Sequence, residues 1–548
     1  MSRVALLSCA ALALAACSSA SNAESPSGSG TDSGTDAGGG GIDARADSDA
    51  PDASTHGDSS AGSDAATPLV WSACDTTGWP SGYPTAPSTL QCTTISVPVD
   101  RSQPGGPMFK LRVGRAKSTA FPTGKAVFAL AGGPGGSAVW ESGVIPQVYP
   151  ALLDTFDIVY VDQRGTGDSD YLDCSNGYPV TQQDWTTCAA EHTTEPLDHY
   201  LTADAAEDIE SVRLQLGYSK AYLRGGSYGT RVGLEYARRY PQNLAAAVLD
   251  GVLPPDVDIY SQEMTAPDTD VADIIADCNA SAACLAVSPT LEADLASRKQ
   301  TLAAHPRAIS IGGQAYTEDD QFFEESLYGA LDWTTTYYEV PRAIHASVGG
   351  DNTLWNGILS NVYGVTVTGM SDPSHRGEII SPVRLHPPRN RSWKGCVVMP
   401  CSYVAPALFE TVTCAEYLPN TSMPNLQTLS AAQSWTYSAD GVDLVGQAQA
   451  CSSWKVSPAG ASERQAVTSP AHVLLMSGAI DDRTPAAWGA QAIKTLPNGK
   501  HVVVPYASHE AGTVFPCAAT MTIQYLVNDG DYSKVDSSCI QSITQPAW

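Results

Sequence analysis

One serine of this chain lies among small residues that suit covalent catalysis. Residues 225–229 read Gly-Gly-Ser-Tyr-Gly, the pattern G-x-S-x-G centred on Ser227. A short apolar run ends just before this pattern, and a segment with helical periodicity follows it. In that context the pattern predicts a tight strand-to-helix turn that raises a serine hydroxyl above a sheet as a nucleophile. The alternative is an ordinary glycine-rich connection.

A nucleophilic serine needs a histidine as base and a carboxylate that orients the histidine. In folds with this turn, the acid and then the histidine follow the serine along the chain. Both His501 and His509 follow the late strand-plus-acid segment. His501 opens a strand, so we expect it to be structural and expect His509, in the loop after that strand, to be the base. Asp481 and Asp482 both follow a strand end, and either fits the acid on these grounds.

A second glycine-rich loop, residues 132–136 (Gly-Gly-Pro-Gly-Gly), follows an early apolar run. The oxyanion of an acyl-transfer reaction needs backbone N–H donors, and glycines let a backbone approach the substrate. We expect these donors to be the amides of Gly133 and of Tyr228, the residue after the serine. A phosphate-binding loop is the alternative, but Pro134 lacks an N–H group and no Lys-Ser/Thr pair follows.

Short apolar runs bounded by glycine, proline or polar residues predict the strands that carry these loops. Helical patterns lie between the runs; one ends at Gly217, and the one after Ser227 ends at Pro241. Alternating strands and helices predict an α/β fold with a mostly parallel sheet and with function at the carboxyl ends of the strands. The runs are residues 126–130, 156–161, 221–224, 246–249, 473–476 and 501–504.

The N-terminal residues predict export. Residues 1–16 contain an apolar run too short for a stable membrane span, which is typical of a signal peptide. Residues 14–17, Leu-Ala-Ala-Cys, resemble a bacterial lipobox, which implies cleavage before Cys17 and its lipidation; plain secretion is the alternative. Residues 17–67 have almost no large apolar side chain and predict a disordered tether. Ser18 favours the outer membrane or cell surface of a bacterial envelope as the location.

Charge and cysteine content narrow the possible partners. The 548 residues carry a formal net charge of −28, which excludes nucleic acid, because phosphate binding needs a basic face. Twelve of the 14 cysteines follow Cys17, and an even number in an exported chain predicts disulfides, most simply between sequential cysteines. The sequence has no cysteine or histidine cluster with zinc spacing and no cofactor motif, so we expect neither a metal nor a cofactor.

Four motifs resemble the prolyl iminopeptidase and tripeptidyl aminopeptidase family of α/β-hydrolases. They are residues 132–137 (GGPGGS), 162–169 (DQRGTGDS), 225–230 (GGSYGT) and 249–256 (LDGVLPPD). The resemblance implies an α/β-hydrolase core formed by residues 68–255 and by residues 431–548, the latter similar to the C-terminal region of tripeptidyl aminopeptidases. Similarity is weakest from about residue 256 to 400, and residues 256–430 are expected to form a largely helical inserted cap.

The resemblance also assigns residues near the C-terminus. The family's acid motif matches Asp481-x-x-Thr484-Pro485, which implies Asp481 rather than Asp482 as the acid. The family histidine lies in a loop similar to Gly-His-Gly, and here it reads Ser508-His509-Glu510, which departs from the glycines. Cys517 and Cys539 match a family cysteine pair. We expect that pair to be bonded, and likewise Cys414 with Cys451.

The activity that the resemblance implies is release of residues or short peptides from peptide N-termini through an acyl-enzyme. An esterase or lactonase with the same Ser227, Asp481 and His509 is one alternative, because the fold does not determine the acyl group. A non-catalytic envelope lipoprotein is another. A free substrate ammonium calls for a nearby carboxylate. We expect Glu416, two residues after Cys414, to supply it; a solvated surface glutamate is the alternative.

Overall fold

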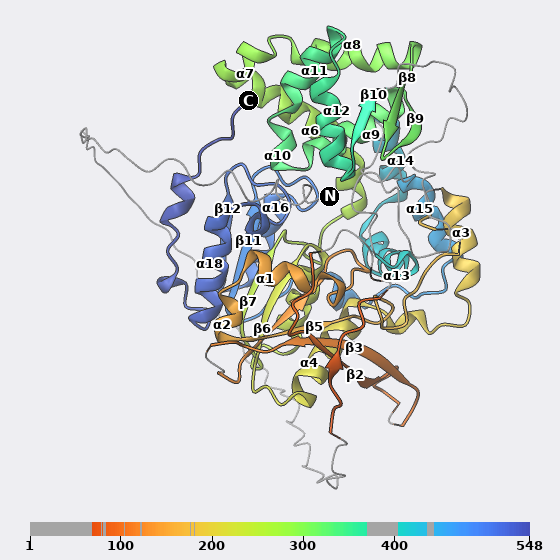
Figure 1. Ribbon diagram of the computed structural model, residues 1–548. Coiled ribbons are helices and arrows are strands. Elements are labelled where there is room, and N and C mark those ends of the chain that lie inside the picture. Colours follow the sequence, from red (N-terminus) through yellow and green to blue (C-terminus); the bar gives the residue numbers. More distant parts are fainter. Residues whose placement is uncertain are drawn as a thin grey trace, which may run out of the picture. The chain divides into compact units, whose positions relative to one another are not determined.

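A sheet of nine strands organises the chain. The computed structural model describes residues 68–548 except 78, 80–83, 104, 121–122, 176, 180, 370–403 and 436–442. The strand order is β1-β2-β3-β5-β4-β6-β7-β11-β12 (Figure 1). The strands are β1 (Ser72–Ala73), β2 (Gln91–Pro98), β3 (Met108–Ala116), β4 (Ala126–Leu130), β5 (Asp157–Val161), β6 (Ala221–Gly226), β7 (Leu244–Asp250), β11 (Val473–Gly478) and β12 (Lys500–Val504).

Six neighbouring strands, from β5 to β12 in the sheet order, run parallel. They coincide with the six apolar runs of the sequence, so the predicted α/β fold with a mostly parallel sheet is confirmed. Strands β1, β2 and β3 pair antiparallel at one edge, and β3 joins β5 antiparallel. Burial largely alternates along β2 and β3, because one face of this edge is exposed. Such strands give no continuous apolar run, which is why the sequence did not reveal them.

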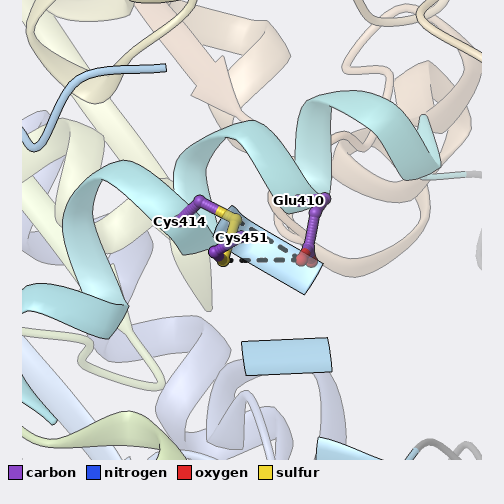
Figure 2. A group of neighbouring side chains, drawn as sticks. All are labelled: Glu410, Cys414 and Cys451. Atoms are coloured by element: carbon purple, nitrogen blue, oxygen red, sulfur yellow. Dashed lines mark hydrogen bonds between the residues drawn. A yellow bond between two sulfur atoms is a disulfide. The ribbon is translucent and has the colours of Figure 1, made fainter. Parts of the chain in front are cut away.

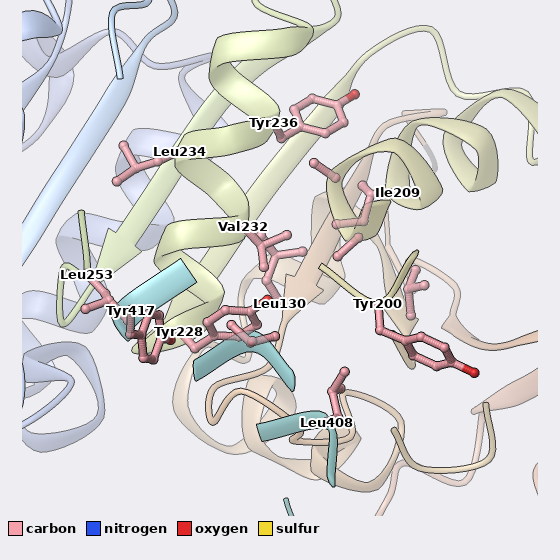
Figure 3. Packing of buried hydrophobic residues seen from close by; sticks show 14 of the residues in the cluster. Leu130, Tyr200, Ile209, Tyr228, Val232, Leu234, Tyr236, Leu253, Leu408 and Tyr417 are labelled. Atoms are coloured by element: carbon pink, nitrogen blue, oxygen red, sulfur yellow. The ribbon is translucent and has the colours of Figure 1, made fainter. Parts of the chain in front are cut away.

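Side chains of the parallel strands alternate between two hydrophobic cores, one on each face of the sheet. On β7, Val248 belongs to one core and Leu249 to the other. Helices α4 and α5 cover the face of Leu249, and Figure 3 shows Val232 and Tyr236 of α5 on the side toward Ile209 of α4. Helices α1, α2 and α18 cover the opposite face. These helices are α1 (Val144–Val148), α2 (Leu152–Thr155), α4 (Thr202–Gln215), α5 (Tyr228–Arg239) and α18 (Pro516–Val527).

The chain between β7 and β11 builds a further group of elements with its own hydrophobic core. The segment predicted as a cap is mainly helical and also contains an antiparallel sheet in the order β10-β8-β9 (Figure 1). Its elements are α6 (Ile259–Ala280), α7 (Ala282–Val287), α8 (Leu291–Ala304), β8 (Arg307–Ile311), β9 (Gln314–Glu318), α9 (Asp320–Leu331), α10 (Thr334–Tyr337), α11 (Val340–Val348), α12 (Thr353–Tyr363), β10 (Val367–Gly369), α13 (Pro406–Val412) and α14 (Met423–Ala432).

Polar contacts attach this segment to the loops after β11 and β12. Thr334 N donates to Ser508 Oγ at 3.2 Å, and Ser508 N donates to Thr334 Oγ1 at 2.9 Å. Arg483 Nε pairs with Asp332 Oδ2 at 2.8 Å. Both attachments therefore lie within two residues of a predicted catalytic side chain. The remaining helices are α3 (Gln182–Glu191), α15 (Leu444–Ala450), α16 (Ala486–Ala492) and α17 (Ala511–Val514).

Five disulfides cross-link the described residues, and each joins sequential cysteines as expected. The pairs are Cys74–Cys92, Cys174–Cys188, Cys278–Cys284, Cys414–Cys451 and Cys517–Cys539. Cys396 and Cys401 lie outside the described residues, as do Cys17, the signal peptide and the tether. Among the helices that the structure describes, none has the length and apolar character needed to cross a membrane.

The bond between Cys517 and Cys539 joins residues 22 positions apart. We expect the double variant Cys517→Ala/Cys539→Ala to lose about 3 kcal/mol of unfolding free energy, because the cross-link restricts the unfolded chain. Denaturant unfolding monitored by circular dichroism measures this loss. As a control, the two proteins should unfold alike after reduction of all their disulfides. A difference below about 1 kcal/mol before reduction would contradict the expectation.

Candidate active site

Ser227 lies on the turn between β6 and α5 with a φ of 51°. This left-handed conformation is uncommon for residues with a side chain and stores strain. Three hydrogen bonds hold it: Ser227 N donates to Asp250 O at 3.0 Å, and Ser227 O accepts from Thr230 N at 2.8 Å and from Thr230 Oγ1 at 2.6 Å. The strand, turn and helix predicted around Ser227 are all present.

Missing side chains bring the strand, the helix and the neighbouring loop close together. A Cβ on Gly225 would lie 2.5 Å from Gly229 O, so a side chain does not fit at this position of the strand. A Cβ on Gly132 would lie 3.2 Å from Ser227 Cβ and 3.8 Å from its Oγ. The loop that carries Gly133 therefore runs beside the Ser227 side chain. Tyr228 is the first residue of α5, and its N–H group has no acceptor within the helix.

His509 and Asp481 form a pair on the loops after β12 and β11, in which the Asp481 side chain is fully buried and that of His509 is 14% exposed. His509 Nδ1 lies 3.0 Å from each oxygen of Asp481. Thr484 holds the carboxylate, since its N donates to Oδ1 at 2.9 Å and its Oγ1 to Oδ2 at 2.7 Å. Burial alone would lower the pKa of His509, but the charge of Asp481 and its hydrogen bond outweigh burial and raise the pKa to about 9.

The residue pair Asp250–Gly251 lies between the serine and the histidine. Asp250 O accepts the hydrogen bond from Ser227 N, and a Cβ on Gly251 would lie 3.0 Å from His509 Cε1. The hydrogen bonds of the described residues include none between Ser227 Oγ and His509. Such bonds are often long without substrate and shorten in the reacting complex. Ser227 and His509 therefore both lie against the residue pair Asp250–Gly251.

The alternative acid, Asp482, and the alternative base, His501, lie outside this arrangement of side chains. Asp482, unlike Asp481, lies beside Asp270 and Asp332 of the cap segment, and burial together with their negative charges raises its pKa well above the usual range. His501 on β12 has its Nε2 3.1 Å from Ser477 Oγ, and burial lowers its pKa. Neither residue contacts the Asp481 carboxylate among the described hydrogen bonds.

Glu416 lies on η5, the π-helical turn Thr413–Tyr417, and is 3% exposed. Its Oε2 pairs with Arg231 Nε at 2.8 Å, and its two oxygens accept bonds from Thr202 N and Thr202 Oγ1, both at 2.7 Å. Thr202 Oγ1 in turn lies 2.9 Å from the hydroxyl of Tyr228. The carboxylate already has a buried cation as partner, so binding a substrate ammonium would require it to exchange Arg231. That role stays a prediction.

Glu410, Cys414 and Cys451 are the one set of potential metal ligands within 4.8 Å of one another in the described part of the chain (Figure 2). Glu410 Oε1 lies 3.4 Å from Cys414 Sγ and 3.6 Å from Cys451 Sγ. The two sulfurs are bonded to each other and offer no thiolate. Burial raises the pKa of Glu410 to about 8, which keeps the carboxyl neutral at pH 7. With the disulfide intact, these groups are a poor donor set for a cation.

Three residues near the turn were not predicted from the sequence as part of the site. Arg224 on β6 pairs with Glu510 at 2.7 Å, and Asp250 Oδ2 accepts a bond from Gly512 N at 2.7 Å. A signal for them was present, because Arg224 is a charged residue inside an apolar run and Glu510 departs from the family's glycine. Asp250 belongs to the motif at residues 249–256.

Comparisons with known proteins agree with the motifs. Residues 125–274 match a family described as alpha/beta hydrolase fold, and residues 439–539 match one described as TAP-like protein. The expected resemblance and the expected α/β-hydrolase fold are therefore confirmed.

Curated relatives include two proteins named as peptidases and one named as an esterase. The chain is 28% identical over 221 residues to the serine protease Hip1 of Mycobacterium tuberculosis, covering 36% of this chain and 42% of that protein. It is 27% identical over 198 residues to the tripeptidyl aminopeptidase of Streptomyces lividans, covering 31% and 37%. It is 31% identical over 229 residues to carboxylesterase B of M. tuberculosis, covering 36% and 43%. The matches span less than half the length of these relatives.

The His509–Asp481 pair predicts a pH dependence. A general base acts in its neutral form, and the pKa of His509 is raised to about 9. We therefore expect kcat/KM for a neutral ester to rise with pH as one proton is lost, with a midpoint near pH 9. Asp481→Asn should move the midpoint to lower pH, because the charge that raises the pKa is gone, and should lower kcat about 10⁴-fold. A wild-type profile that is flat from pH 7 to 10 would contradict this assignment.

Proposed function

We propose that this chain, an α/β-hydrolase with a TAP-like C-terminal region, is a serine peptidase that removes residues or short peptides from peptide N-termini. One observation carries the proposal: the Asp481–His509 pair lies next to the strained turn of Ser227. Nucleophile, base and orienting acid come from three separate loops at the carboxyl ends of β6, β12 and β11, as acyl-transfer chemistry on this kind of sheet requires.

The proposed reaction follows from these positions. His509 donates its Nδ1 hydrogen to Asp481, so Nε2 is the nitrogen that takes the proton of Ser227 as Oγ attacks the acyl carbon. The N–H groups of Tyr228 and Gly133 stabilise the oxyanion. His509 then gives its proton to the leaving amine, and a water molecule activated by His509 hydrolyses the acyl-enzyme. Asp481 keeps the imidazole oriented and stabilises its charged form throughout.

The choice of a peptide as substrate rests on the relatives. Two of the three are named as a serine protease and a tripeptidyl aminopeptidase, and the C-terminal match is to TAP-like proteins. Carboxylesterase B keeps an esterase or lactonase as the second candidate, because the same residues accept either acyl group. A non-catalytic lipoprotein is disfavoured by the hydrogen-bonded pair of Asp481 and His509 beside Ser227, because binding alone does not require this arrangement.

Export is supported by the five disulfides, since such bonds persist in oxidising compartments. The lipobox-like residues before Cys17 are the basis for the further proposal that the protein is lipidated there. Residues 17–67 would then act as a tether between the envelope and the catalytic part. Ser18 supports the outer membrane or cell surface as the location.

We expect Ser227→Ala and His509→Ala each to lower kcat by about 10⁶-fold, and the double variant to be little worse, because the three side chains act as a unit. Steady-state kinetics with a chromogenic substrate measures this. A fluorophosphonate should label the wild type and leave Ser227→Ala unlabelled. His501→Ala serves as the control and should keep near-normal activity. Loss of activity in His501→Ala with retention in His509→Ala would refute the assignment of the base.

A substrate comparison tests the peptidase proposal. We expect a tripeptidyl arylamide with a free amino terminus to exceed its N-acetylated form at least about tenfold in kcat/KM, because a charge-assisted hydrogen bond to the ammonium contributes roughly 1.5–3 kcal/mol. Equal cleavage of both would remove the aminopeptidase proposal and leave the hydrolase. Turnover of short acyl esters with no measurable arylamide cleavage would establish the esterase alternative instead.

A further inference from the structure

A charged network lies beneath the turn of Ser227. Arg224 points from β6 into the protein and its side chain is 9% exposed. Its Nη2 lies 2.7 Å from Glu510 Oε2 and 3.1 Å from the hydroxyl of Tyr149. The guanidinium also lies over the Tyr149 ring, 5.3 Å from the centroid. The nucleophile's own strand is thus bonded to the residue that directly follows His509.

Glu510 occupies space that a glycine leaves free. A Cβ on Gly226 would lie 2.4 Å from the carboxyl carbon and both carboxyl oxygens of Glu510. Glu510 also has a φ of 56°, in the left-handed region that favours glycine. A glutamate in this conformation is strained, and the ion pair with Arg224 offsets part of that strain. The side chain therefore has a specific place, and the backbone is strained to keep it there.

The same loop is attached to the turn a second time. Asp250, at the end of β7, accepts a bond from Ser227 N with its carbonyl oxygen and one from Gly512 N with Oδ2, at 3.0 and 2.7 Å. Asp250 is 1% exposed. The loop of His509 is consequently held from two strands, through Glu510 to β6 and through Gly512 to β7.

Two further carboxyl groups, those of Glu141 and Asp250, face Arg224. Burial, followed by the charge of Glu510, raises the pKa of Glu141 to about 8. Burial raises the pKa of Asp250 to about 6 in spite of the charge of Arg224. Around neutral pH Arg224 therefore faces two carboxylates, those of Glu510 and Asp250. Among the described hydrogen bonds, its guanidinium bonds to the carboxylate of Glu510 and not to that of Asp250. For His509, burial lowers the pKa, and the charge of Glu510 adds to the larger raising effect of Asp481.

We propose that Glu510 is a positioning residue whose carboxylate, paired with Arg224, fixes the His509 loop against the Ser227 turn. The proposal rests on the proposed function, in which Ser227 is the nucleophile and His509 the base. No hydrogen bond joins Ser227 Oγ to His509 among the described residues, so the distance between the two side chains depends on how their loops are anchored. Misplacing a base by about 1 Å can lower a rate a hundredfold, so the anchors of this loop matter to turnover.

Charge-changing variants of the pair test the proposal. We expect Glu510→Gln to lower kcat ten- to hundredfold with little change in KM. It should also move the rising limb of kcat/KM to lower pH, because a negative charge near His509 is lost. Arg224→Met should move the limb to higher pH, because the charge of Glu510 is no longer neutralised. Arg224→Lys, which keeps the charge, should restore part of the activity. The opposite directions of the two shifts are the diagnostic result.

Glu210→Gln is the matched control. Glu210 pairs with Arg213 at 2.6 Å on α4, where the two side chains are 9% and 6% exposed, and it touches none of the catalytic loops. It should lower stability and leave both kcat and the pH limb unchanged. If Glu510→Gln behaves like this control, Glu510 is structural and the proposal is wrong.

Two further variants test the role of Glu510 even if Glu510→Gln does not fold. If Glu510→Gln does not fold, Glu510→Gly removes both the strain and the ion pair. It should fold and still lose kcat; full activity in that variant would overturn the proposal. Arg224→Met/Glu510→Gln should be less impaired than Arg224→Met alone, because the double variant has no Glu510 carboxylate that lacks its cation. Failure of the proposed function would show differently, as a wild type without hydrolase activity or a Ser227→Ala variant that retains it.

Discussion

The strained backbone of Ser227, with its positive φ, depends on the hydrogen bonds and close packing of the residues around it. A serine with this strained backbone costs about 1–3 kcal/mol and is kept there by bonds to Asp250 and Thr230. The turn is possible because Gly225 and Gly229 carry no side chain and strand and helix meet backbone to backbone. Two further loops then converge on the same point: the glycine-rich loop beside Ser227 and the loop of His509.

Burial sets the chemistry of the histidine. In a low-dielectric setting the imidazole would favour its neutral form, yet the Asp481 carboxylate, itself bonded twice by Thr484, reverses this preference. A fixed negative charge of this kind stabilises the imidazolium that forms when the serine proton is transferred. Glu510 and Asp332 add smaller contributions of the same sign. The site thus favours a positive His509, which is the state that the transition state needs.

Features that depend on local sequence pattern, such as the parallel strands, were predictable from the sequence. Contacts between residues far apart in the chain were not. The parallel strands were predictable because both faces are buried and their side chains are continuously apolar. Residue types alone left Asp481 and Asp482 equivalent; they differ because cap residues surround only Asp482. The partner of Glu416 is Arg231 on α5, far away in sequence, so no spacing rule reveals that ion pair. Sequential disulfides were predictable because they close short loops.

The sheet has one further property that follows from where the cap is inserted. Strands β7 and β11 are neighbours, with Ala247 opposite Val473, although the whole cap separates them in sequence. While the chain emerges, β7 has an open hydrogen-bonding edge, and its apolar faces stay incompletely covered until β11 is available. The cap has its own core and can assemble meanwhile from nearby residues. Closing the sheet is therefore the late, non-local step of folding, and the period before it is when the chain is most exposed to aggregation.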